Sequence, residues 1–537
     1  MNNLVQLWNA RKSSFEVWYK MFQLYDDLAQ SNMESVISSD PRTGFNMARW
    51  LLIPRTSAFK VDSTGMTETE ALRTGVIEQY ADRQLVLLTR KRRTSLFGSP
   101  LSRLVGLMLA TGWYSVASVP TPHGWAMEVW NPAQVFPDYD DDGALIRAAR
   151  VYKMRSDRAN TLIGMSGWNP PDRAFTGKEV TVRMLWKITR YGVEHSVVIG
   201  THLAKPPTLA PLDYIPVFTG PVAGLPDSGE ITKGENWRGE VGESLIAPIR
   251  DIAKNYDKML TYLQQLLRDT ANPRWVEKSK GQPRVNPDEL FKRGAKFNLE
   301  PDESLEPVST PPLPAEIRGH QFDLHNQVQR GLFSDISFGN ITQQVSGYLM
   351  TQVTSSAKQT LDPFFTGVRD VMGEVATRNI EFMRRAGWDL GDKPFPEIGG
   401  ELALDFDYDV EIPGDFIQRV SAARVANPTF KLSTATLHNV LFPEVQNSLV
   451  EQSRIRAEEA TENPVFRQLL LLRELNRAAN EARENEDPEM AEWLDRAAGL
   501  VEQQGLSAAD PGGLEAQPVG MRPEALPPEV QEVLAGR

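Results

Sequence analysis

The chain of 537 residues contains no cysteine, and this absence excludes several classes of protein at once. Disulfide scaffolds, cysteine-ligated zinc sites, iron–sulfur clusters and thiol nucleophiles all require the missing side chain. Long hydrophobic runs are also lacking, because the best stretch, 104–113, is much shorter than the ~18 apolar residues of a membrane span. The first residues lack the apolar core of a signal peptide, so we expect cytosolic synthesis and no membrane partner.

Positive charge is scarce, and the deficit is concentrated at one end of the chain. The formal net charge is −12, and 474–537 contributes −9 of it, with 14 acidic residues against 5 basic ones. The rest of the chain is therefore close to neutral. Because affinity for nucleic acids comes mainly from Lys and Arg contacts to phosphates, this composition argues against a tight DNA-binding protein.

Catalytic motifs are missing as well. The nearest match to a phosphate-binding loop, 229–235, has Glu235 where that motif needs its lysine, and a carboxylate there would repel phosphate. The spacing around Ser166 does not fit a nucleophile elbow. His320 and His325 are five positions apart, which places them on diverging faces of a helix. We therefore predict no catalytic residue, no metal site and no cofactor.

One acidic string resembles the beginning of a calcium loop. Asp138, Asp140, Asp142 and Gly143 match its first positions, but Ala149 stands where the loop needs a bidentate glutamate. An acidic turn before a strand is the favoured interpretation. A second charged string, 90–93, is either a solvated helix face, which we favour, or a phosphate site.

The spacing of apolar residues predicts a mixed α+β fold that is mainly helical. Residues 1–112 have near-helical spacing, and 113–222 switch to alternation, which predicts antiparallel strands with a hairpin around Tyr191–Gly192. The Gly- and Pro-rich residues 222–242 have the composition of a linker. A helix from Leu245 to Asp269 follows, whose apolar residues alternate steps of four and three and form a seam for neighbouring helices. These residues are Leu245, Ile249, Ile252, Tyr256, Met259, Leu263 and Leu266.

A small proline-rich β module, 273–314, separates this helix from a second one, 315–333. The module is locally basic. We predict that its cations form a docking surface, although a solvated loop is an equal alternative for each of them. They are Lys278, Lys280, Arg284, Lys292, Arg293 and Lys296.

The second half of the chain begins with a polar, almost uncharged loop, 334–346. A helix from Gly347 to Ala386 is expected next, with a kink at Pro363, and then a strand at 401–412. Residues 463–505 have helical spacing. The Pro- and Gly-rich residues 506–537 are expected to be disordered.

This order of elements resembles the portal, or head-to-tail connector, family of tailed bacteriophages. The residues that carry the resemblance are 130–154, 243–273, 334–364 and 404–428. The resemblance implies a ring subunit with a wing, a two-helix stem, a small α/β clip, a tunnel loop and a helical crown. These parts correspond to 1–242 and 347–450 (wing), 243–272 and 315–333 (stem), 273–314 (clip), 334–346 (tunnel loop), and 451–505 (crown), with 506–537 as a tail.

The resemblance also implies a function and partners. The subunit would belong to a ring of twelve at the portal vertex of the capsid in the virion, assembled in the host bacterial cytoplasm. Double-stranded DNA would pass through the ring without sequence preference, and the terminase large subunit, the major capsid and scaffolding proteins, and the neck or head-completion proteins would bind to it. The seam residues of 243–272 would pack the ring. The tunnel loop would contact DNA through Asn340, Thr342, Gln343, Gln344 and Ser346.

Two other classes of protein stay open at this point. One is a nucleic-acid-processing enzyme whose active site is too dispersed to recognise in a sequence. The other is a helical adaptor or scaffold protein that forms no pore. The size of the assembled particle distinguishes both from a closed ring.

Overall fold

The computed structural model divides the chain into two units, Met1–Thr429 and Phe430–Arg537. The fold is mixed α+β, as the sequence predicts. No helix within the described residues is both long and apolar enough to cross a membrane. The described residues are 2–28, 35–53, 57–62, 66–224, 241–271, 275–279, 281, 285–286, 297–308, 315–332, 347–408, 455, 464–484, 490 and 493–499.

The first unit begins with helices, which confirms the prediction for this segment except at one strand. Ser99 caps α5 by accepting a hydrogen bond from the Ser102 amide, and α5 is the short apolar run that the sequence shows before residue 113. Its apolar side chains are buried, so this run is a core helix. The helices are α1 (Asn2–Leu7), α2 (Asn9–Phe22), α3 (Asp40–Leu52), α4 (Glu68–Arg92) and α5 (Pro100–Thr111).

The unpredicted strand is β1 (Ser57–Val61), which pairs antiparallel with β12 (Leu404–Tyr408). Phe59 lies opposite Phe406, and both side chains are buried. Glu78 and Asp82 of α4 accept the amides of Val61 and Phe59, so the helix holds the strand by its backbone. The strand at 401–412 was therefore predicted, while its partner was not.

Two antiparallel sheets follow α5, as the alternation predicts. The predicted hairpin is confirmed, since β6 and β7 pair from Val182–Ile199 to Thr189–Gly192. Helix α6 (Ser156–Ser166) between β5 and β6 was not predicted. The three-stranded sheet has the order β3-β2-β9, with β2 (Trp113–Thr121), β3 (Gly124–Val129) and β9 (Val217–Pro221). The five-stranded sheet comprises β4 (Val135–Tyr139), β5 (Leu145–Arg155), β6 (Glu179–Thr189), β7 (Gly192–Ile199) and β8 (His202–Leu209).

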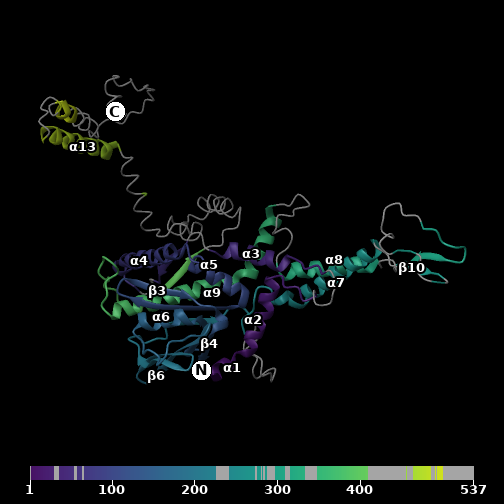
Figure 1. Ribbon diagram of the computed structural model, residues 1–537. Helices are drawn as coiled ribbons and strands as arrows, with labels where there is room; N and C mark the ends of the chain where they lie inside the picture. Colours follow the sequence, from purple (N-terminus) through teal and green to yellow (C-terminus); the bar gives the residue numbers. More distant parts are fainter. Residues whose placement is uncertain are drawn as a thin grey trace, which may run out of the picture. The chain divides into compact units, whose positions relative to one another are not determined.

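We call the first unit without the insertion between β9 and α9 the body, and its hydrophobic core the body core. The long helix α9 (Gly347–Arg385) forms the centre of this core (Figure 1). Its apolar residues Phe364, Val368 and Val375 have helical spacing and are buried, and the helix continues through Pro363. Asn379, also buried, donates to Ser118 Oγ of β2 at 2.7 Å. This hydrogen bond fixes α9 against the three-stranded sheet.

The described part of the second unit is helical. Helix α13 (Pro464–Glu484) lies where the sequence predicts it, and the residues at 493–499 are helical as well. An ion pair between Arg483 and Asp495 joins the two segments. The expected disordered tail, 506–537, lies outside the described residues.

Candidate functional site

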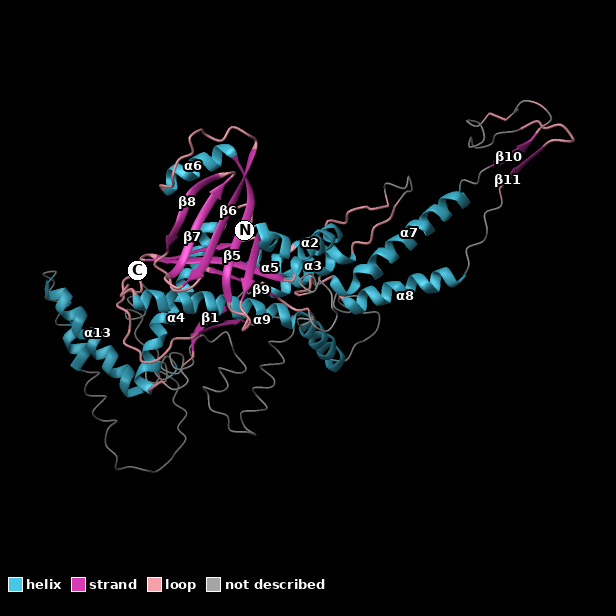
Figure 2. Ribbon diagram, turned by 90° about the horizontal axis from the view of Figure 1, so that it is seen from below, coloured by secondary structure: helices cyan, strands magenta, loops and turns pink. Residues whose placement is uncertain are grey.

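The insertion between β9 and α9 forms a helical hairpin, which is the candidate functional site. Helix α7 (Arg250–Ala271) and helix α8 (Ala315–Gly331) pack against each other (Figure 2). Between them, β10 (Trp275–Lys278) pairs antiparallel with β11 (Ser304–Pro307), which confirms β structure in the proline-rich module. We call these four elements the stem hairpin.

The stem hairpin is attached to the body by a short segment before α7. The predicted helix start at Leu245 is wrong by five residues, because the one-turn 3₁₀ helix η4 (Ala247–Ile249) comes first. Leu245 and Ile249 are buried in the body core of the chain itself, and the Leu245 amide donates to Leu109 O of α5 at 3.0 Å. Their apolar spacing therefore reflects core packing at the base of the hairpin.

The five remaining seam residues share one face of α7 and are half-buried. This face of α7 points toward α8, because the ring centroid of Tyr256 lies 5.7 Å from that of His325 on α8. The His325 Nδ1 in turn lies 3.8 Å from an Asp40 carboxylate oxygen. The predicted divergence of His320 from His325 is consistent with this, since His320 is exposed. The five residues are Ile252, Tyr256, Met259, Leu263 and Leu266.

The two helices approach closely at the base. A Cβ atom added to Gly331, the last residue of α8, would lie 2.2 Å from Ile249 Cγ2. Val328, one turn earlier, is buried in the same core. Glycine at 331 is thus required by the distance between α8 and η4.

Three large apolar side chains on the two helices of the stem hairpin, α7 and α8, are exposed. Tyr262 is 58% exposed, Leu267 62% and Phe322 65%. Neither Tyr262 nor Leu267 belongs to the seam, so the spacing analysis did not select them. Because α7 and α8 pack against each other, these exposed apolar side chains make the hairpin a candidate surface for a partner. We call Tyr262, Leu267 and Phe322 the exposed hairpin residues.

The opposite side of α7 is bound to the segment that precedes α3. Asp257 accepts the Ser38 amide at 2.8 Å, and buried Thr261 accepts the Val36 amide at 3.1 Å. Burial raises the pKa of Asp257 to about 6, against the effect of the Ser38 amide and with added repulsion from Asp40 and Asp26. The two side chains therefore fasten 36–38 to the helix by its backbone.

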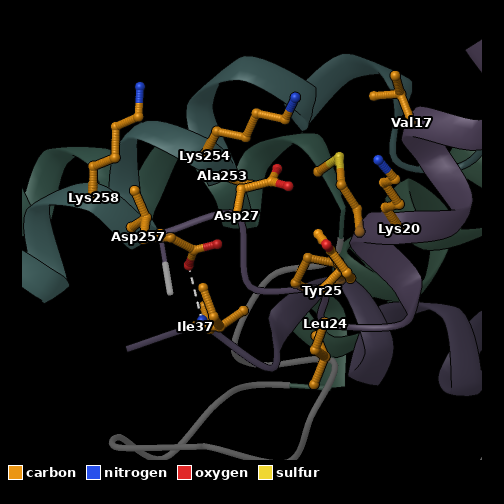
Figure 3. Close-up of a pocket in the computed structure, with 14 residues that line it drawn as sticks. Val17, Lys20, Leu24, Tyr25, Asp27, Ile37, Ala253, Lys254, Asp257 and Lys258 are labelled. Carbon is orange, nitrogen blue, oxygen red and sulfur yellow. Dashed lines mark hydrogen bonds between the residues drawn. The ribbon is translucent and has the colours of Figure 1, made fainter. Parts of the chain in front are cut away.

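A pocket of about 170 Å³ lies beside this contact (Figure 3). Its apolar wall comes from α2 and α7, and Lys254 and Lys258 stand at its edge. Leu24 also lines it and has a φ of +54°, which is unusual for a leucine, because the Leu24 and Tyr25 amides close the last turn of α2.

Of the predicted docking and tunnel-loop residues, Lys278 lies within the described part of the chain. Lys278 lies at the end of β10 and is exposed. The other five predicted docking cations, Lys280, Arg284, Lys292, Arg293 and Lys296, lie outside the described residues. The same is true of all the predicted tunnel-loop residues, Asn340, Thr342, Gln343, Gln344 and Ser346.

The acidic string before β5 is a turn, as favoured from the sequence. Asp138 forms an ion pair with Arg147, and Asp140 Oδ1 accepts the amides of Asp142 and Ala144 at 3.1 and 2.6 Å. The described residues contain no group of three or more His, Cys, Asp or Glu side chains that could hold a metal ion.

Comparison with known proteins gives structural similarity without sequence similarity. No family model and no curated protein matches the chain. A chain from the virion of a native gene transfer agent particle is similar, with 12% identity and a TM-score of 0.42, over 75% of this chain and 89% of that one. A chain from the neck of the empty particle, computed with C6 symmetry, has 12% identity and a TM-score of 0.40, over 77% and 92%. One from the neck of the native particle, computed with C12 symmetry, has 12% identity and a TM-score of 0.38, over 75% and 90%.

Proposed function

We propose that the chain is the structural subunit of a portal ring in a tailed-phage-like particle. The observation that carries the proposal is the stem hairpin, which joins the body to a small β ribbon and exposes Tyr262, Leu267 and Phe322. Covering these side chains with a second copy of the same hairpin, by a head-to-tail contact, generates a ring when the rotation closes. The order of elements along the chain supports the same class of protein.

The ring would serve as a conduit for double-stranded DNA. In this proposal the DNA passes the loop at 334–346, and the β ribbon with Lys278 and its neighbouring cations binds the packaging motor and later the neck proteins. The near-neutral body suits passage, because dense Lys and Arg contacts to phosphates would hold the duplex in place. No chemical step is required of the chain.

The mass of the purified particle tests the proposal. A ring of twelve copies of the 60.2 kDa chain would have a mass of about 0.7 MDa under closed cyclic symmetry. We expect this mass by light scattering after size exclusion, and a central pore in negative-stain micrographs. A monomer or dimer at micromolar concentration would overturn the ring and favour an enzyme or adaptor.

The role of the polar loop needs a separate test. Gln343→Arg combined with Gln344→Arg should leave ring mass unchanged and slow DNA packaging, most strongly at low salt, because added cations bind successive phosphates. Gln343→Asn with Gln344→Asn is the matched control and should package at the normal rate. Equal rates for both variants at every salt concentration would show that the loop does not contact DNA.

A further inference from the structure

Three arginine side chains from separate segments meet around one carboxylate at a corner of the body. Arg92 ends α4 and its Nη2 lies 3.5 Å from Glu128 Oε1 of β3. Arg150 of β5 places Nη1 3.9 Å from Glu128 Oε2. Arg103, in the first turn of α5, interacts electrostatically with both Arg92 and Glu128. We call Arg92, Arg103 and Arg150 the arginine cluster.

Glu128 cannot satisfy the donors of the arginine cluster. Each guanidinium has five N–H donors, and the Arg92–Glu128 and Arg150–Glu128 separations both exceed the ~2.7–2.9 Å of a charge-assisted hydrogen bond. One Glu128 oxygen is already used, since it accepts the Trp130 Nε1–H at 3.1 Å. Among the described residues, the Glu128 carboxylate is therefore the counter-charge for all three arginines, and it makes no close hydrogen bond to any of them.

Arg150 is the most enclosed member of the cluster. Its side chain is only 17% exposed, and its Cζ lies 4.2 and 4.3 Å from the ring centroids of Trp130 and Tyr152. Its buried Nε has no hydrogen-bond partner in the described part of the chain. The two rings flank the guanidinium of Arg150 and restrict its orientation.

The arginines also repel one another. Burial lowers the pKa of Arg150, and Arg103 lowers it further. Burial likewise lowers the pKa of Arg103, with a further contribution from Arg92. An added anion would relieve this repulsion, because the cluster carries three positive charges against the one negative charge of Glu128.

An exposed aromatic side chain lies directly beside the cluster, and the residue before it in the chain is exposed and apolar as well. Arg103 Cζ lies 3.8 Å from the ring centroid of Phe97, which is 53% exposed. Leu96 is 92% exposed. Apolar and arginine side chains together are enriched at the centres of protein interfaces, whereas surfaces that follow a nucleic-acid strand form extended basic tracks.

We propose that the arginine cluster is a docking site for an acidic segment of a partner protein. Carboxylates of the partner would bind the guanidinium forks in pairs of parallel hydrogen bonds, and an apolar side chain next to them would cover Leu96 and Phe97. The site uses no residue of the stem hairpin, so this proposal does not depend on the proposed ring.

The test measures binding of a short fluorescein-labelled peptide of Glu, Leu and Phe to the full chain by fluorescence anisotropy. Arg92→Gln with Arg103→Gln should weaken binding about tenfold or more, because charge-assisted hydrogen bonds are lost. Arg190→Gln is the matched control, since Arg190 is an exposed arginine over the Tyr191 ring at 4.5 Å, and it should bind normally. Glu128→Gln should tighten binding, which an unfolded variant cannot do.

Three outcomes would overturn the proposal. The first is unchanged affinity in the double variant while its thermal unfolding stays normal. The second is weaker binding of Glu128→Gln than of the original chain. The third is tighter binding of a DNA oligonucleotide of equal charge than of the peptide, which would assign the site to nucleic acid. A peptide of Glu alone should bind more weakly than the mixed peptide, and equal binding would remove Leu96 and Phe97 from the site.

Discussion

At the scale of single residues, the base of the stem hairpin depends on a carboxyl group held in an unfavourable environment. The pKa of Asp257 is raised to about 6 because burial disfavours its charged form. An unfolded chain releases this proton near pH ~4. The folded state therefore binds more protons between about pH 4 and 6, and the free energy of unfolding falls as the pH rises through that window.

Asp257→Asn removes this dependence while keeping an oxygen that can accept the Ser38 amide. We expect the variant to be more stable than the original chain by about 1 kcal/mol at pH 8, a value reduced for partial solvent screening, and equally stable at pH 4. Urea unfolding at both pH values measures the difference. Asp251→Asn is the control, since Asp251 pairs with Arg250 on the exposed side of α7 and should bring no gain. The same change at both pH values would contradict this account.

Gly331 provides a second test at this scale. Gly331→Ala should destabilise the body by about 1–3 kcal/mol, because the new Cβ would overlap Ile249 Cγ2, although alanine favours helix more than glycine does. Gly319→Ala on the same helix has nothing within 4 Å of the added Cβ and should stabilise it slightly. Thermal unfolding compares the two. Ile249→Ala removes the overlapping Cγ2, so it should cost less stability in the Gly331→Ala background than in the original chain.

At the scale of elements, local patterns were predicted well and long-range contacts were not. The course of α9 and the two helices of the hairpin follow from spacing within each segment. The start of α7 does not follow from spacing, because Leu245 and Ile249 have the same spacing whether they line a helix seam or fill the body core. The arginine cluster was also out of reach of the sequence, since its members come from α4, α5 and β5.

At this scale we predict that the exposed hairpin residues are needed for assembly of the ring. Tyr262→Ser with Phe322→Ser should leave the fold intact, because both side chains are mostly exposed, and should reduce the assembled particle to smaller species. Size exclusion with light scattering measures the mass, and circular dichroism checks the fold. Ile188→Ser with Leu203→Ser, exposed positions on β6 and β8, is the control and should assemble normally. Normal assembly of the hairpin variant would remove the ring contact from this surface.

At the scale of the whole molecule, the acidic end forms part of a unit distinct from the body. The residues from 474 onward carry −9 of the net charge of −12. A chain ending before Leu506 should therefore fold and assemble as the full chain does, with a mass lower only by the deleted residues. Aggregation of the shortened chain would mean that the deleted residues stabilise the body.

The pairing of β1 with β12 has a consequence for how the protein is made. Lys60 and Asp407, which form an ion pair across these strands, are 347 positions apart in the sequence. A ribosome adding ~5–20 residues per second needs roughly 20–70 s to cover that distance. Throughout this time β1 lacks β12 and Phe59 lacks its partner, although the stem hairpin, which ends at Gly331, is synthesised before β12. The nascent body is thus open to aggregation until β12 leaves the ribosome, and we expect its synthesis to depend on chaperones that hold unfinished chains.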